Sequence, residues 1–215
     1  MFRLSSLAHL RASARALICA VVLLAVSVPA LAARTVLVFG DSLSAGYGIR
    51  QDAAWPNLLG QRLAARGFDY SVVNASISGE TTSGGRSRLD AVLERHRPAV
   101  LILALGSNDG LRGLPVRTVR DNLNAMIDSA QKHKVRVLLL PQHLPPNYGP
   151  YADDFAAVFP AVAKARKVAL GDYLLADIAT ELRYFQADQL HPTAEAQPIL
   201  LDTVWRRLEP LLKGR

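Results

Sequence analysis

Ser42 is the first residue whose type and position suit chemistry. It stands in Gly-Asp-Ser-Leu-Ser at 40–44, directly after an apolar run at 36–39 that predicts a buried strand. A serine at a strand-to-helix turn is exposed, and the amides that follow it can stabilise nearby negative charge. Both properties suit a nucleophile. The loop by itself favours a simpler role, in which Asp41 or Ser42 caps a helix.

A serine nucleophile needs a general base, and the base usually needs an acid that orients it. His191 follows Asp188 by three residues in a loop ahead of the last predicted helix, so both can face one crevice. A histidine before a proline can also simply end a loop. His143 is the rival base, although no acid lies beside it. His96 and His133 lie at polar helix ends and are poor candidates.

Acyl transfer also needs hydrogen-bond donors aimed at the oxyanion that develops on the substrate. Gly79 can offer a backbone N–H with no Cβ in the way, and Asn108 can offer its side-chain amide. Each has an ordinary alternative, Gly79 as a turn glycine and Asn108 as a loop cap. Only in combination do these residues suggest a serine hydrolase.

Strand-like and helix-like segments alternate along the chain. The predicted strands cover 36–39, 70–74, 100–105, 135–140 and 168–170, and the predicted helices cover 55–66, 83–95, 118–130, 151–166 and 193–212. The third helix is expected to start at a capping box, Thr-Val-Arg-Asp at 118–121, with an apolar face of Val119, Leu123, Met126, Ile127 and Ala130. This alternation predicts one three-layer α/β/α domain around a mainly parallel five-stranded sheet.

Ligands of open parallel α/β sheets bind at the carboxyl ends of the strands. The loops that should carry chemistry are therefore 40–49, 74–82, 106–113 and 142–151, all rich in glycine and small polar residues.

The N-terminus has the layout of a secretory signal peptide. Arg3, Arg11 and Arg15 precede a short apolar run at 16–28, and Pro-Ala-Leu-Ala at 29–32 supplies a small-residue cleavage site. The alternative is a retained membrane anchor, but the run is shorter than the roughly 20 residues that span a bilayer. We therefore expect cleavage and export.

Cleavage divides the chain into a signal peptide, 1–32, and a single domain, 33–215. The only cysteine, Cys19, lies inside the apolar run, which argues against a lipoprotein signal. The domain then has no disulfide, thiol nucleophile or cysteine metal site. Its net charge falls from +7 to about +4 with no basic run, so we expect no nucleic-acid partner.

Four sequence blocks together resemble the GDSL/SGNH hydrolase superfamily. They are Gly-Asp-Ser-Leu-Ser at 40–44, Gly79, Gly-Ser-Asn-Asp at 106–109 and Asp-Gln-Leu-His at 188–191. The segments 74–82, 108–113 and 144–149 are most similar to the periplasmic acyl-CoA thioesterase/arylesterase/lysophospholipase branch, and this resemblance covers nearly all of 33–215.

The resemblance implies a flavodoxin-like fold and hydrolysis of esters and thioesters without a metal or organic cofactor. Carried over by position, Ser42 is the nucleophile, His191 the general base and acid, and Asp188 the residue that orients His191. The Ser42 and Gly79 amides and the Asn108 side chain form the oxyanion hole. We expect a periplasmic enzyme, with secretion as the alternative, that is monomeric and acts on small-molecule or lipid esters without stable membrane insertion.

Two positions depart from this branch. Ser107 stands where a second glycine is usual, and His143 stands where an arginine is common; both affect substrate choice rather than reaction class. A preference for long acyl chains requires an apolar groove, which we expect to be lined by Leu111, Leu114, Tyr148 and Phe155. The alternatives are a carbohydrate or cell-wall O-deacetylase and a non-catalytic exported binding domain.

Overall fold

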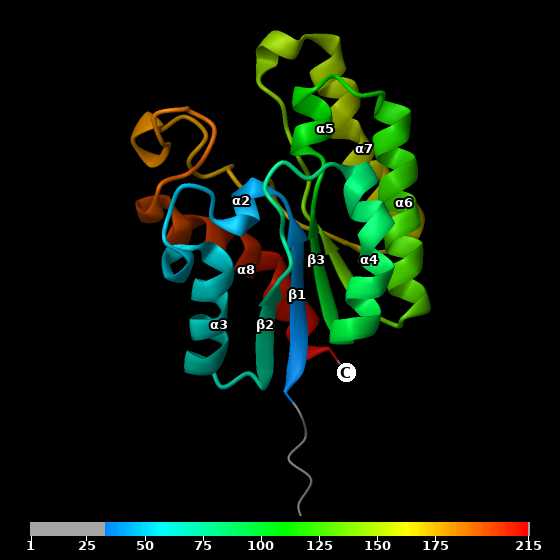
Figure 1. Cartoon of the computed structure of the whole chain (residues 1–215), viewed down its shortest axis with the longest axis vertical. Coiled ribbons are helices and arrows are strands. Elements are labelled where there is room, and N and C mark those ends of the chain that lie inside the picture. Colours follow the sequence, from blue (N-terminus) through cyan, green and yellow to red (C-terminus); the bar gives the residue numbers. More distant parts are fainter. Residues whose placement is uncertain (1–32, 215) are drawn as a thin grey trace, which may run out of the picture. The chain divides into compact units, whose positions relative to one another are not determined.

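The computed structural model describes residues 33–214, so the predicted signal peptide lies outside the described residues. The domain is built on one sheet of five parallel strands in the order β2-β1-β3-β4-β5 (Figure 1). The strands are β1 (Arg34–Gly40), β2 (Tyr70–Asn74), β3 (Val100–Ala104), β4 (Arg136–Leu139) and β5 (Ala169–Leu170). The five-stranded parallel sheet predicted from the sequence is confirmed.

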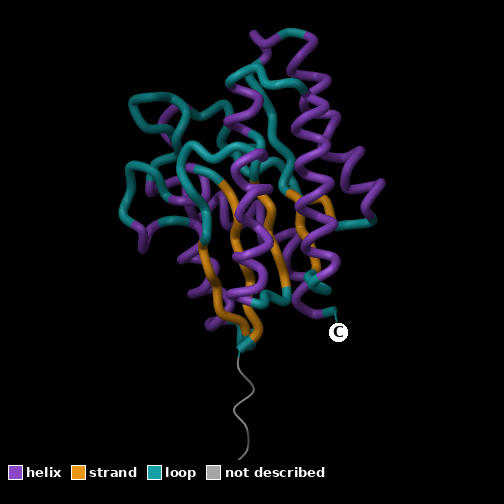
Figure 2. The backbone as a smooth tube through the Cα atoms, turned by 45° about the vertical axis from the view of Figure 1, so that its right-hand side comes forward, coloured by secondary structure: helices purple, strands orange, loops and turns teal. Residues whose placement is uncertain are grey.

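Helices cover both faces of the sheet (Figures 1 and 2). Helices α3 (Trp55–Ala65) and α8 (Gln197–Lys213) pack on one face. Helices α4 (Thr82–His96), α6 (Val116–Lys132) and α7 (Pro150–Arg166) pack on the other. The three-layer α/β/α arrangement is therefore also confirmed.

Strand β1, which lies between β2 and β3, supplies both hydrophobic cores because successive side chains of a strand point to opposite faces. Val36 and Val38 belong to the core under α3 and α8. Leu37 and Phe39 belong to the core under α4, α6 and α7. All four side chains are fully buried, so the end of β1 is a rigid support for the loop that follows it.

Two short helices, α2 (Ser42–Ala45) and α5 (Ser107–Leu111), follow β1 and β3 at the carboxyl end of the sheet (Figure 1). Single 3₁₀ turns complete the described structure at Gln51–Ala53, Pro146–Tyr148, Leu182–Tyr184 and Ala194–Ala196. Within residues 33–214, no helix combines the length and apolarity needed to cross a membrane.

The predicted start of α6 is wrong. The helix begins two residues earlier, at Val116, and Pro115 is its N-cap. The amides of Thr118 and Val119 donate to the Pro115 carbonyl at 2.8 and 3.3 Å, so Thr118 lies inside the first turn and caps nothing. Pro115 itself is not helical, with a ψ of 127°, and Val116 is the first helical residue. The apolar face predicted for this helix is confirmed, since all five of its residues are buried.

Candidate active site

Ser42 is the first residue of α2, immediately beyond the buried end of β1. Asp41 caps the helix, because its Oδ1 accepts a hydrogen bond from the Leu43 amide at 3.1 Å. Gly46 ends the helix in the left-handed region, with a φ of 72°. The amide of a first helical residue has no partner inside its helix, so the Ser42 N–H is free to act as a donor. The capping role considered for this loop therefore falls to Asp41.

The loop after β2 fixes the position of α2 from the side. The Asn74 Nδ2 donates to the Ser44 carbonyl at 2.8 Å, and the Gly40 amide donates to Ser76 Oγ at 3.0 Å. These bonds join both ends of the Ser42 segment to the last residue of β2 and to the loop that follows it. The serine is thereby held by the sheet rather than by its own short helix.

Ser42, His191 and Asp188 form a continuous chain of hydrogen bonds. Ser42 Oγ lies 2.9 Å from His191 Nε2, and His191 Nδ1 lies 2.7 Å from Asp188 Oδ2. Asp188 Oδ1 accepts two further bonds, from the amides of Leu190 and His191, each at 3.0 Å. The serine and the histidine are 149 residues apart in the chain. The sequence-predicted residues are thus brought together in the geometry of a serine–histidine–aspartate triad.

These hydrogen bonds keep Asp188 ionised. The His191 amide, then the Leu190 amide and then the His191 ring lower the pKa of the Asp188 carboxyl to about 2. Donors to a carboxylate favour its charged form. An ionised Asp188 holds the proton of His191 on Nδ1 and leaves Nε2 free to accept the proton of Ser42.

The loop that carries His191 is joined to the loop that carries Ser42. Gln186 Nε2 donates to the Tyr47 carbonyl at 2.8 Å and to the Pro192 carbonyl at 3.0 Å. The Tyr47 ring lies against the His191 ring, with the centroids 4.4 Å apart. The sequence analysis missed Gln186, because a lone glutamine in an irregular loop gives no signal of such a role.

Asn108 lies beside Ser42 in the lining of one cavity. Its Nδ2 donates to the Glu80 carbonyl at 3.0 Å, so the amide is held in one orientation. Gly79 precedes Glu80 with a φ of +80°, which favours glycine, and open space lies where a Cβ would stand. Its carbonyl accepts a bond from Arg112 Nη2 at 3.2 Å. Asn108 therefore lines the cavity beside Ser42. Gly79 does not line the cavity, but it belongs to the loop whose Glu80 carbonyl is bonded to Asn108.

Asp41 is a buried carboxyl directly beneath the site, with 1% of its surface exposed. Burial raises its pKa to about 6, against the opposing effects of the Leu43 amide, the Ser107 hydroxyl and the charge of His191. Ser107 Oγ donates a hydrogen bond to Gln142 Oε1 at 2.6 Å. The serine that replaces the usual glycine is therefore engaged in polar contacts under the site.

A second buried carboxylate fixes α5 against α4. Asp109 accepts hydrogen bonds from the Thr82 amide at 2.8 Å and the Thr82 hydroxyl at 2.6 Å. Asn122 Nδ2 donates in turn to Thr82 Oγ1 at 3.1 Å. All three side chains are buried. This network fixes the position of α5, and therefore of the neighbouring Asn108, at the carboxyl end of β3.

An apolar cavity of about 450 Å³ opens beside Ser42 and His191. Its apolar lining consists of Leu43, Leu111, Leu144, Pro145, Pro146, Leu175, Ala179, Phe185 and Leu190. Of the four residues predicted to line a groove, Leu111 does so, while Leu114, Tyr148 and Phe155 do not. Phe155 is fully buried in the core beneath α6 and α7, because the inner face of α7 turns away from the cavity.

His143 also lines the cavity, where its ring lies 4.7 Å from the ring of Tyr173. Burial lowers the pKa of His143, which favours the neutral imidazole. His191, and not this rival base, holds the Ser42 hydroxyl. His143 is therefore part of the cavity wall.

The chain matches the model of the GDSL-like lipase/acylhydrolase family over residues 38–198. It is 47% identical to esterase TesA of Pseudomonas aeruginosa over 182 residues, which are 84% of this chain and 90% of that protein. It is 39% identical to thioesterase 1/protease 1/lysophospholipase L1 of Escherichia coli K12 over 184 residues, 85% of this chain and 87% of the relative.

Among solved structures, it resembles the psychrotrophic esterase EstA of Pseudoalteromonas, in a form inhibited by monoethylphosphonate. The TM-score is 0.81 at 38% identity, covering 84% of this chain and all of that one. The chain belongs to the GDSL-like lipase/acylhydrolase family and is an ester hydrolase.

Proposed function

We propose that the enzyme cleaves carboxylic esters and thioesters through an acyl-enzyme on Ser42. The observation that carries this proposal is the hydrogen-bonded chain from Ser42 through His191 to Asp188 at the edge of an apolar cavity. The hydroxyl that would be acylated and the space that would hold an acyl chain are adjacent.

In the first step, His191 Nε2 takes the proton of Ser42 as Oγ attacks the acyl carbonyl. The negative charge that develops on the carbonyl oxygen is stabilised by the Ser42 amide, the Gly79 amide and the Asn108 side chain. Asp188 stabilises the imidazolium through Nδ1. The carbon–oxygen or carbon–sulfur bond then breaks, and His191 gives its proton to the departing alcohol or thiol.

In the second step, a water molecule replaces the leaving group. His191 removes a proton from this water as its oxygen attacks the acyl-enzyme, and the same donors again hold the oxyanion. Collapse of this intermediate returns the proton to Ser42 Oγ and releases the carboxylic acid. The enzyme ends the cycle unchanged, so the residues of the chain supply all the acid–base chemistry.

The substrates we propose are aryl esters, acyl-CoA thioesters and lysophospholipid-type acyl chains. The apolar lining of the cavity suits an acyl chain better than a sugar. The names of the relatives, an esterase and a thioesterase/lysophospholipase, agree with this substrate class. The phosphonate that inhibits the Pseudoalteromonas esterase is tetrahedral at phosphorus, as the proposed intermediate is at carbon, so the same inhibitor class should block Ser42 here.

We further propose that residues 1–32 are a signal peptide and that cleavage releases a monomeric periplasmic enzyme, with secretion from the cell as the alternative. The basic residues, short apolar run and small-residue site support this proposal. The absence of a basic run in 33–215 argues against a nucleic-acid partner.

The test is hydrolysis of p-nitrophenyl acetate, butyrate, octanoate and palmitate by residues 33–215, beside a folded Ser42→Ala variant. We expect the wild type to cleave these esters and the variant to be inactive. Equal activity of the two proteins would remove Ser42 from the mechanism. A sharp preference for acetate would favour the carbohydrate or cell-wall deacetylase. Inactivity of both proteins on all four esters would favour the non-catalytic binding domain or a carbohydrate esterase of narrow specificity.

A further inference from the structure

One side of the cavity is formed by an irregular segment, residues 171–181, which we call the wall loop. Tyr173, Leu175 and Ala179 of this loop line the cavity. Residues 174–180 of this loop form turns, closed by hydrogen bonds such as that from the Ala176 amide to the Tyr173 carbonyl at 3.0 Å, and the rest of the loop has no regular structure. It therefore lacks the repeated backbone bonds that hold the helices and strands around it.

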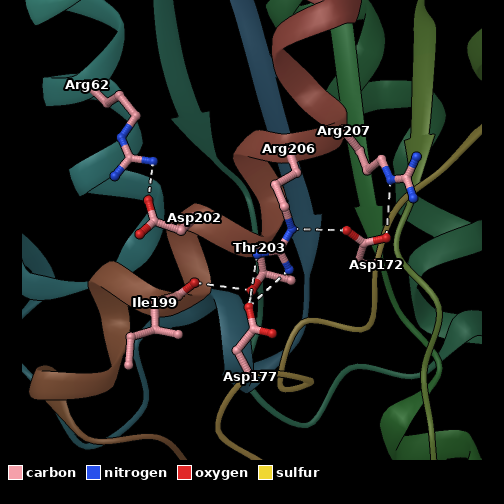
Figure 3. A network of polar contacts seen from close by, with 8 residues as sticks. All are labelled: Arg62, Asp172, Asp177, Ile199, Asp202, Thr203, Arg206 and Arg207. Atoms are coloured by element: carbon pink, nitrogen blue, oxygen red, sulfur yellow. Dashed lines mark hydrogen bonds and ion pairs between the residues drawn. The ribbon is translucent and has the colours of Figure 1, made fainter.

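Arg206 of α8 forms hydrogen bonds to two acidic residues of the wall loop (Figure 3). Its Nη1 and Nη2 each donate to Asp177 Oδ2 at 3.0 Å, and its Nε lies 3.3 Å from Asp172 Oδ2. One guanidinium thus joins two acids that are five positions apart. Tyr173 and Leu175 lie between these acids, so the segment between the acids contains two of the three wall-loop residues that line the cavity.

Two further residues of α8 complete this attachment. Thr203 Oγ1 donates to Asp177 Oδ2 at 3.0 Å, and Arg207 Nε donates to Asp172 Oδ1 at 3.1 Å (Figure 3). The Arg206 and Thr203 hydrogen bonds lower the pKa of Asp177, so its carboxylate is charged. The planar fork of arginine allows several bonds in a fixed geometry, which the single ammonium of a lysine does not.

We propose that Arg206, with Asp172 and Asp177, is a positioning residue for acyl-chain selection. This inference rests on the proposed function. An acetyl group has one carbon beyond the carbonyl and needs only the site around Ser42. A longer chain needs the cavity wall, and its binding depends on Tyr173 and Leu175 being already in place. Ordering a loop in its bound conformation favours binding because the ligand does not have to order it.

A purely structural role for Arg206 makes a different prediction. Exposed ion pairs contribute little to global stability, and slightly less than half of each side chain is accessible in this pair, 47% for Arg206 and 44% for Asp177. A general loss of stability would also lower activity on all esters alike. Positioning of the cavity wall would instead alter KM for long chains and leave acetate turnover intact.

A matched control lies on the same helix. Asp202 forms an ion pair with Arg62 of α3 at 2.6 Å, and this pair does not involve the wall loop (Figure 3). The Asp202→Asn variant therefore removes a surface ion pair of α8 without releasing the cavity wall.

The experiment compares wild type, Arg206→Gln, Arg206→Lys, Asp177→Asn and Asp202→Asn on p-nitrophenyl acetate and octanoate, with circular dichroism to check folding. We expect Arg206→Gln and Asp177→Asn to lower kcat/KM for octanoate about fivefold, mainly through KM, with acetate within about twofold of wild type. Arg206→Lys should recover part of this loss, and Asp202→Asn should behave as wild type.

Two results would overturn the inference. If the ratio of kcat/KM for octanoate to kcat/KM for acetate is unchanged in Arg206→Gln and Asp177→Asn, the bonds between α8 and the wall loop have no role in acyl-chain selectivity. An equal change in Asp202→Asn shows that any ion pair of α8 has the same effect. Failure of the proposed function is distinguishable from both, because it would appear as an inactive wild type.

Discussion

The carboxyl of Asp41 should oppose folding at neutral pH, and replacing it with an amide should remove this effect. Asp41 is buried, and its pKa rises from 3.8 to about 6 because the charged form is poorly solvated there. Between these two pH values the folded protein binds a proton that the unfolded chain releases. The stability contributed by this group therefore falls as pH rises through that window.

The size of the effect follows from the shift. Each pKa unit corresponds to 1.36 kcal/mol, so a shift of roughly two units gives about 3 kcal/mol. Asp41→Asn keeps an oxygen that can accept the bond from the Leu43 amide and has no proton to exchange. We expect the free energy of unfolding of Asp41→Asn, relative to wild type, to increase by about 3 kcal/mol from pH 3.5 to pH 7.

The assay is urea unfolding of both proteins at several pH values, with stability extrapolated linearly to water. Ser44→Ala is the matched control, because Ser44 is fully buried in the same short helix and has no titrating group in this range. The free energy of unfolding of Ser44→Ala should differ from that of wild type by the same amount at every pH. A pH-independent difference between Asp41→Asn and wild type would refute the reasoning.

Three further predictions concern the proposed chemistry. Asn108→Ala should lower kcat about 100- to 1000-fold with folding intact, because one oxyanion donor is lost; steady-state kinetics with near-normal turnover would exclude Asn108 from that role. Asp188→Asn should lower kcat by about 10⁴, since an amide no longer fixes the proton of His191 on Nδ1; a small change with unaltered KM would contradict this. Gly79→Ala should lower the free energy of unfolding by about 1 kcal/mol, because its φ of +80° strains any residue with a Cβ; thermal melting that matches wild type would contradict it.

The fold was predictable because its signals are local, and the positions of the candidate triad were predictable because several short motifs together resemble one family. The buried strand β3 is a continuous apolar run, and the segments that carry Ser42 and His191 are short motifs whose spacing needs no tertiary information. Parallel strands place their carboxyl ends at one edge, and this rule brings distant motifs together. The sequence therefore predicted the meeting of residues that only the folded chain joins.

The errors arose where two local signals compete or where tertiary packing decides. The capping-box pattern at Thr118 predicted a helix start, but the helix already begins at Val116, directly after Pro115. The sequence predicted that Phe155 lines a groove, but the orientation of α7 buries its side chain in the hydrophobic core. The wall loop has no periodicity and no motif, so its attachment to Arg206 was not predictable from the sequence.

The long separation between Ser42 and His191 has a consequence for the order of events during synthesis. The sheet around β1 can form from the first half of the chain. His191, the proposed base, is synthesised 149 residues after Ser42. The last helix, α8, also completes the core on one face of the sheet through Leu200, Val204 and Leu208. A nascent chain that lacks the His191 segment has no Ser42–His191 hydrogen bond. Under the proposed mechanism its serine is inert, and hydrolysis begins only when the final segment docks. Recovery of activity during refolding reports this closing step and should follow, never precede, the return of native helix content.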